Sequence, residues 1–155
     1  LHNRKHSFPT RRSSDLPYEN PAMTLQIAAA LIVAAILFGG MVLYSFGFAA
    51  FLFTSLPADD AGSLLRRAFP HFYLWVIATA LLAALLQLGA DPVSLGLLVA
   101  VAATTVPTRQ LLMPAINAAT DAGDKRRFNR LHGLSVVITL GHIAAVGYVL
   151  LRFVD

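Results

Sequence analysis

Residues 25–56 contain no charged side chain, and this run limits what the chain can fold into. About 20 apolar residues are enough for an α-helix to cross a bilayer. Three further apolar runs follow, at about 71–88, 93–113 and 131–153. We therefore predict an all-α membrane protein, a four-span transmembrane helix bundle that forms one domain over residues 23–155, with the first helix at about 25–56.

The composition agrees with membrane spans. The chain is 57% hydrophobic and 13% charged, with a mean hydropathy of +0.66. A soluble domain averages about 45–50% apolar and about 25% charged residues. Cysteine is absent, which excludes a disulfide framework and thiolate ligands. The first run exceeds the core of a signal peptide, which is about 7–15 residues long, so we expect a span there.

The first 22 residues are expected to stand outside the membrane domain. Residues 6–16 read HSFPTRRSSDL, which resembles the translation of a short-read sequencing adapter. Such artefacts are set aside before a fold is inferred. We therefore interpret residues 1–22 as an adapter translation with a disordered lead-in, and the native start as Met23 or a residue lost upstream. The alternative is a basic arm that anchors the chain at the cytoplasmic surface.

Basic residues gather on one side of the predicted bundle. In a four-span protein the first and third loops share a side, and short basic loops stay in the cytoplasm. The opposite side holds only Arg152 once residues 1–22 are set aside. We therefore expect both loops in the cytoplasm and both termini outside, in a bacterial-type plasma (inner) membrane. The basic residues of the two loops are Arg66, Arg67, Arg109, Lys125, Arg126, Arg127 and Arg130.

Four polar side chains follow one face of the fourth predicted helix: His132, Ser135, Thr139 and His142. They are three, four and three residues apart, so they share a stripe. Ionisable groups inside spans mark functional sites by default. Polar side chains of membrane helices also hydrogen-bond to neighbouring helices and fix their packing. We favour the packing role. The alternative is a polar pathway or ligand pocket, in which His142 would titrate near neutral pH.

A metal site is a further hypothesis for the histidines. His132 and His142 lie about 15 Å apart along a helix, too far to share an ion. His71 and His132 are both expected at cytoplasmic helix ends and could converge, yet a site there would need a third ligand from the third loop. We therefore expect no metal and no other cofactor. The secondary site candidates are His71, Arg109 and Asn117.

A basic cluster, formed by Lys125, Arg126, Arg127 and Arg130, precedes the fourth predicted helix. Such clusters beside a span bind anionic lipid headgroups. They also act simply as topology signals, which we consider the better interpretation. The net charge of +4 does not indicate nucleic-acid binding, because four of the basic residues lie in the adapter-like lead-in.

Residues 38–151 resemble the transmembrane protein 205-like family, known as domain of unknown function 4149. The blocks that carry the resemblance are FAAFLFTSLPADDAG with LLRRAFPHFY, LLMPAINAATDAGD, and FNRLHGLSVVITL. His132, Gly133 and Ser135 match the family pattern H-G-x-S-x-x-x-N, whereas Thr139 stands where asparagine is common. The resemblance implies a four-span integral membrane protein and brings no settled activity, substrate or cofactor.

These features together favour a structural or interaction role over catalysis. We expect no enzyme, because no nucleophile with a base and no phosphate-binding glycine loop is present. The expected partners are the lipid bilayer and a second copy or another membrane protein, with no nucleic acid. The first alternative is a small transporter or export accessory subunit. The second is a membrane metal or redox protein that uses the histidines.

Overall fold

The computed structural model describes residues 21–154. The adapter-like peptide at 6–16 lies outside the described residues, and of the predicted lead-in 1–22 only residues 21 and 22 are described, which begin the first helix. All regular elements of the described part are helices, and four continuous helical stretches are long and apolar enough to cross a membrane. The prediction of an all-α, four-span bundle is therefore confirmed.

Two of the four spans contain a π-helical turn. The first span consists of α1 (Pro21–Val42), the π-helical turn η2 (Leu43–Phe48) and α2 (Ala49–Ser55), and the second is α3 (Ala58–Leu86). The third consists of α4 (Pro92–Pro107), the π-helical turn η3 (Thr108–Leu112) and α5 (Met113–Asp121), and the fourth is α6 (Lys125–Leu151).

The second helix is longer than the predicted 71–88. Leu56 is extended, with φ −130° and ψ 155°, because Pro57 disfavours helical backbone in the residue before it. The helix then starts at Ala58, where two aspartates in the first turn suit the positive end of the helix dipole. Pro70 lies inside α3 and does not end it. The stretch that we predicted as a loop is therefore mostly helix.

The third helix also extends beyond the predicted 93–113, to Asp121. The fourth, predicted at 131–153, begins earlier, at Lys125, and ends at Leu151. Proline removes one backbone hydrogen bond from a helix, and the chain widens into η3 directly after Pro107. The Thr108 hydroxyl donates to the Thr104 carbonyl at 2.8 Å, and the helix continues through η3 and α5 to Asp121. At α6, the Asp124 carboxylate accepts from the backbone N–H of Arg127, which starts that helix earlier than predicted.

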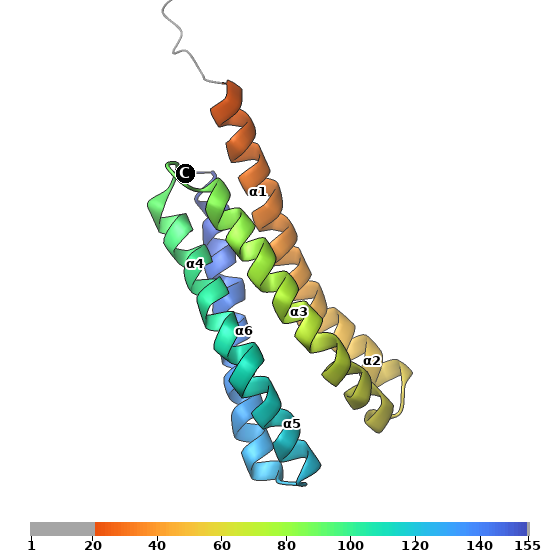
Figure 1. Ribbon diagram of the computed structural model, residues 1–155. Helices are drawn as coiled ribbons and strands as arrows, with labels where there is room; N and C mark the ends of the chain where they lie inside the picture. Colours follow the sequence, from red (N-terminus) through yellow and green to blue (C-terminus); the bar gives the residue numbers. More distant parts are fainter. Residues whose placement is uncertain (1–20, 155) are drawn as a thin grey trace, which may run out of the picture.

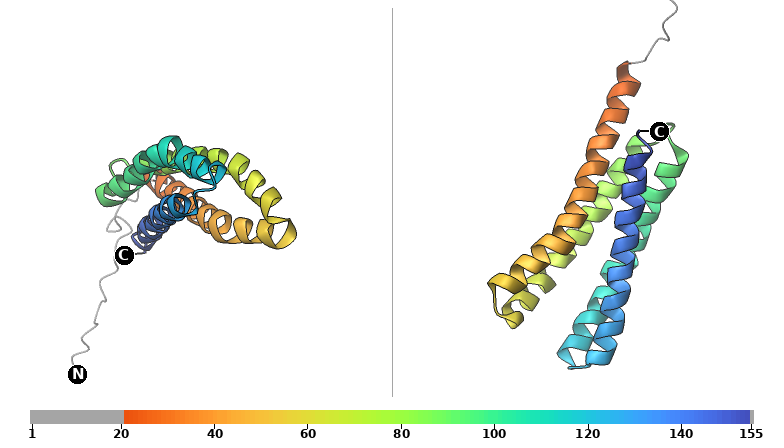
Figure 2. Two further views of the ribbon diagram at one scale, coloured as in Figure 1. Left: turned by 90° about the horizontal axis from the view of Figure 1, so that it is seen from below. Right: turned by 180° about the vertical axis from the view of Figure 1, so that it is seen from behind.

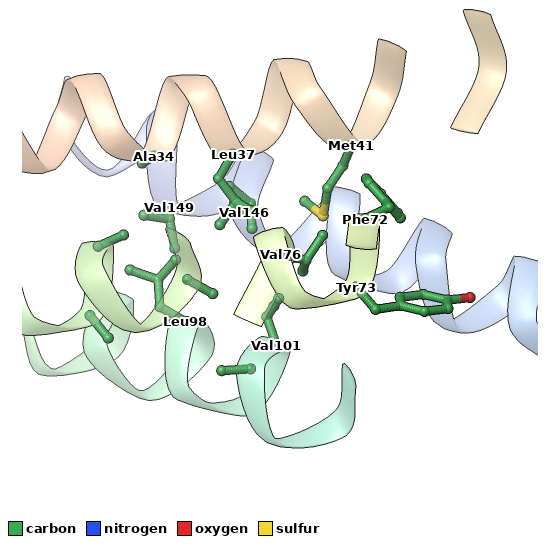
Figure 3. Packing of buried hydrophobic residues seen from close by; sticks show 14 residues of the cluster. Ala34, Leu37, Met41, Phe72, Tyr73, Val76, Leu98, Val101, Val146 and Val149 are labelled. Carbon is green, nitrogen blue, oxygen red and sulfur yellow. The ribbon is translucent and has the colours of Figure 1, made fainter. Parts of the chain in front are cut away.

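The core is built from one stripe of each span. In α1 the buried residues Ala30, Ala34, Leu37 and Met41 recur at helical spacing. Figure 3 shows Leu37 and Met41 among core side chains of the other three spans. Gly40 of α1 lies so close to Trp75 of α3 that a Cβ atom there would fall 2.1 Å from the indole ring. Small residues permit such close helix approach inside membranes.

The bundle is not packed equally along its length. The first two spans form one hairpin and the last two form a second (Figure 1). The hairpins are close where α1 begins and α6 ends, and they diverge toward the α2–α3 and α5–α6 junctions, as both Figure 1 and Figure 2 show. We call the end where α1 begins and α6 ends the tied end. We call the end with the α2–α3 and α5–α6 junctions the open end.

Candidate functional site

A cleft of about 550 Å³ lies between the two hairpins at the open end. One wall comes from α2 and the first half of α3, and the other comes from α5 and the first turns of α6. Phe69, Tyr73 and Met113 lie at the positions nearest the core. The cleft is therefore enclosed by apolar groups on its inner side. Its polar lining residues are Asp59, Ser63, Arg66, Asn117, Thr120, His132 and Ser135.

Three of the predicted site residues line this cleft. His132 and Ser135 contribute from α6, and Asn117 contributes from α5. The His132 ring is exposed and stacks on Phe128, with ring centroids 5.3 Å apart and planes 6° apart. Asn117 is a secondary candidate in the sequence and is not connected there with the α6 stripe. The structure joins the two sets in one cleft.

The other half of the predicted stripe has a different place. Thr139 donates its hydroxyl to the Ser135 carbonyl of its own helix at 2.9 Å. His142 turns to α4, where its Nε2 atom lies 2.7 Å from the Thr104 hydroxyl oxygen. Neither Thr139 nor His142 is among the residues that line the cleft. The four residues therefore do not form one polar site.

The contact between the Thr104 hydroxyl and His142 Nε2 joins α4 to α6. The Thr104 hydroxyl also donates to the Ala100 carbonyl of its own helix at 2.6 Å. A side chain that links two membrane helices in this way fixes their packing.

His71 and Arg109 lie outside the cleft. His71 lines a separate apolar groove of about 830 Å³ between the first span and α3, so it does not share a pocket with His132. Arg109 donates from its Nε atom to the Pro70 carbonyl at 3.3 Å and thereby links η3 to α3. Within residues 21–154, no three His, Cys, Asp or Glu side chains gather closely enough to hold a metal ion.

One ion pair crosses the cleft near its mouth. Arg66 of α3 donates to the Asp121 carboxylate at the end of α5 at 2.6 Å. The two side chains keep 36% and 65% of their surface exposed, so water screens this pair. The predicted basic cluster lies at the same end of the molecule, on the first turns of α6. Its four members, all exposed, are Lys125, Arg126, Arg127 and Arg130.

A second ion pair, which sequence analysis missed, closes the tied end. Arg152 donates to both carboxylate oxygens of Asp91, at 2.6 and 2.9 Å. Asp91 also caps α4 by accepting from the Val93 N–H, and it accepts from the Ser94 hydroxyl at 2.5 Å. The Arg152 guanidinium, and next the Ser94 hydroxyl, hold the pKa of Asp91 well below its usual range. The capping pattern D-P-x-S was a readable signal for Asp91, whereas its pairing with Arg152 was not.

A comparison with known protein families shows which family the chain belongs to. The family described as Domain of unknown function (DUF4149) matches residues 32–125, which is more than half of the chain. The chain belongs to this family. The matched residues include the cleft walls from α2, α3 and α5, whereas the cleft residues of α6 follow after the matched stretch. No curated protein and no solved structure matches the DUF4149 chain.

Proposed function

We propose that this DUF4149 protein is a non-enzymatic membrane protein of the transmembrane protein 205-like type that binds a ligand or a partner segment in the cleft. The proposal rests on the cleft, which has a volume of about 550 Å³ and is lined by polar groups from both hairpins. Ligand sites generally occupy about 300–1,000 Å³ and combine apolar walls with a few polar groups.

A binding role fits the cleft better than a catalytic one. Catalysis by a serine requires a base within hydrogen-bond reach of its hydroxyl. His132 and Ser135 both line the cleft, but no hydrogen bond joins their side chains in the described part of the chain. The polar groups of the cleft instead suit recognition, since they supply donors and acceptors from both walls.

The location and partners belong to the same proposal. We place the protein in a bacterial-type plasma (inner) membrane with the open end in the cytoplasm, because the basic loop residues gather at that end. The bilayer is then its main partner, with a second copy or another membrane protein as a further one, and no nucleic acid. A reporter enzyme fused after Asp155 should show its activity outside the cytoplasm, where we place the C-terminus. Reporter activity in the cytoplasm would overturn this orientation.

A distance measurement across the cleft tests the binding role. The chain has no cysteine, so Ser63→Cys and Thr120→Cys carry spin labels at two unique positions on opposite walls. The measurement uses an extract of the membranes that produce the protein, separated into a lipid phase and an aqueous phase. One phase should shift or narrow the distance distribution, and the cleft-filling variant Gly62→Leu should abolish this response. An unchanged distribution with both phases would overturn the proposal.

A small transporter or export accessory subunit is the second candidate. The observation that favours it is the asymmetry of the bundle, which is open at one end and held by the Asp91–Arg152 pair at the other. Alternating access requires the tied end to open as well. Spin labels at Ala90→Cys and Val154→Cys should then give two distance populations in lipid. A single narrow population under all conditions would remove this candidate.

A further inference from the structure

The occupant of the cleft can be narrowed to one chemical class. We propose that the cleft holds an anionic phospholipid of the leaflet at the open end, with its headgroup at the mouth and an acyl chain directed toward the core. This inference rests on the proposed function, because it names the ligand of the same cleft.

Polar and apolar lining residues follow one another in order along the cleft. Arg66 and Thr120 lie toward the mouth, near the end of the hairpins, whereas Phe69, Tyr73 and Met113 lie toward the core. Since the spans cross the bilayer, the mouth is at the level of the lipid headgroups and the inner side points to the hydrocarbon centre. A phospholipid of that leaflet has its polar and apolar parts in the same order. Such a phospholipid can therefore enter the cleft in the orientation that it has in the leaflet.

Charge at the open end favours an anion over a cation. The helix ends there carry six basic side chains and four acidic ones. The cleft itself is lined by one cation, Arg66, and one carboxylate, Asp59, so the excess positive charge comes from the basic cluster on the first turns of α6. Basic clusters beside membrane spans bind anionic lipid headgroups. The basic residues are Arg66, Arg67, Lys125, Arg126, Arg127 and Arg130, and the acidic residues are Asp59, Asp60, Asp121 and Asp124.

Arg66 lines the cleft and is also the cation of the ion pair with Asp121. A headgroup phosphate at the mouth would compete with the Asp121 carboxylate for the same guanidinium. The two residues therefore have opposite effects on lipid binding, although both belong to one ion pair.

The experiment measures lipid binding by the purified full chain in detergent micelles. The probes are palmitoyl-oleoyl phosphatidylglycerol, phosphatidylcholine with the same acyl chains, and inorganic phosphate. Thermal unfolding reports binding, because a ligand of the folded state raises the unfolding temperature. Native mass spectrometry counts retained lipid. We expect one retained phosphatidylglycerol per chain, bound at least tenfold more tightly than phosphatidylcholine, and no response to inorganic phosphate.

Two matched pairs of variants locate the site. Gly62 lines the cleft, and neither Gly62 nor Gly96 has an atom within 4 Å of an added Cβ. Gly62→Leu should abolish lipid retention, whereas Gly96→Leu on α4 should retain the lipid as the native chain does. Arg66→Gln should weaken phosphatidylglycerol binding roughly fivefold, because one basic residue near a headgroup strengthens the binding of an anionic lipid by about this factor. The exposed Arg67, which does not line the cleft, is the control, and Arg67→Gln should change binding less.

Asp121→Asn separates lipid binding from a purely structural effect. It breaks the same ion pair as Arg66→Gln, so a structural role predicts that both variants shift lipid binding in the same direction. Lipid recognition predicts that Asp121→Asn tightens phosphatidylglycerol binding while Arg66→Gln weakens it. Shifts in one direction would overturn the inference, and so would equal affinity for the two lipids or equal retention by Gly62→Leu and Gly96→Leu.

The spin-label pair in the cleft distinguishes failure of this inference from failure of the proposed function. A distance change with the aqueous extract alone, absent in Gly62→Leu, would overturn the lipid inference and leave the binding role standing. An acidic peptide from a partner would give that result. No change with any phase or probe would overturn both.

Discussion

The two ends of the bundle are held together by different kinds of contact. At the tied end, Arg152 binds Asp91 through two hydrogen bonds, and the Gln26 side chain of α1 donates to the Leu86 carbonyl at 2.9 Å. The open end has the more exposed Arg66–Asp121 pair and a cleft. The buried residues of α6 show the same asymmetry, since both of them, Val146 and Val149, lie in its last two turns.

Side-chain size explains where the hairpins separate. Lipid is as apolar as a helix surface, so membrane helices associate through close packing and polar contacts instead of the hydrophobic effect. Near the tied end the buried face of α3 consists of alanines, Ala80, Ala83 and Ala84, which allow close approach. Toward the open end, the larger side chains of Phe69 and Met113 line the gap. The tightly packed part of the bundle and the candidate binding cleft therefore lie at opposite ends.

Loss of packing in the core should lower the stability of the protein most. Leu98 of α4 is fully buried, whereas Leu134 of α6 near the cleft is 51% exposed. Leu98→Ala should lower the free energy of unfolding by about 2–5 kcal/mol because it leaves a cavity. Leu134→Ala should cost less than about 0.5 kcal/mol. Reversible unfolding in mixed micelles measures both, and similar costs would contradict the unequal packing of the two ends.

The next effect is expected from the ion pair at the tied end. Asp91→Asn should destabilise the protein at neutral pH, by less than Leu98→Ala. The folded-state pKa of Asp91 is lowered, chiefly by Arg152. Its contribution is therefore present above the unfolded pKa of about 3.9 and is lost as the pH falls below it.

Thermal unfolding as a function of pH tests this linkage. The native chain should lose stability between about pH 4 and more acidic values, and Asp91→Asn should lose less over the same range. Asp121→Asn at the open end is the control, and it should follow the native acid profile more closely than Asp91→Asn does. Parallel curves for the native chain and Asp91→Asn would refute the role of the pair.

A smaller effect is expected from the hydrogen bond between α4 and α6. A double-mutant cycle with Thr104→Val and His142→Leu isolates this contact. Interhelical hydrogen bonds of membrane proteins average about 0.6 kcal/mol and reach about 1.7 kcal/mol, and we expect a coupling energy in this range. The matched cycle pairs Thr139→Val with His142→Leu and should give no coupling, because Thr139 bonds to its own helix. Coupling in the second cycle alone would contradict our assignment.

The spans could be predicted from sequence because they depend on local composition alone. An uncharged run such as 25–56 has few alternatives to a membrane helix. The start of α3 was missed because the stretch from 58 to 70 contains charges and a proline, which resemble a loop. Its helical conformation depends on Pro57 ending the previous helix and on the two aspartates of the first turn. Pro57 and the two aspartates are local signals for a helix start at this position. A search for apolar runs does not detect the start, because the first turns of α3 are polar.

The candidate site was predictable only in part. Spacing on a helix shows that His132 and His142 share a face, but it does not show how far a neighbouring helix follows that face. Because the hairpins diverge, His142 meets α4 while His132 borders the cleft. The pairing of Asp91 with Arg152 joins residues 61 positions apart. Such contacts depend on the angle between hairpins, which no single-sequence pattern contains.

Loss of the ion pair at the open end should change stability least. Arg66 and Asp121 form an exposed ion pair, and such pairs contribute about 0–1 kcal/mol. Arg66→Gln and Asp121→Asn should therefore each change the free energy of unfolding by less than about 0.5 kcal/mol in lipid-free detergent. The same denaturant series as for Leu98→Ala measures this.

A near-zero change in the free energy of unfolding for Arg66→Gln and Asp121→Asn is informative, because the geometry of the two ion pairs is similar. Both have a contact of 2.6 Å, yet only the Asp91–Arg152 pair is bidentate, with more of both side chains covered. If Arg66→Gln instead costs as much as Asp91→Asn, the open end is held as firmly as the tied end. The cleft would then be a rigid packing gap, because a site that admits a ligand between two hairpins needs contacts there that exchange easily.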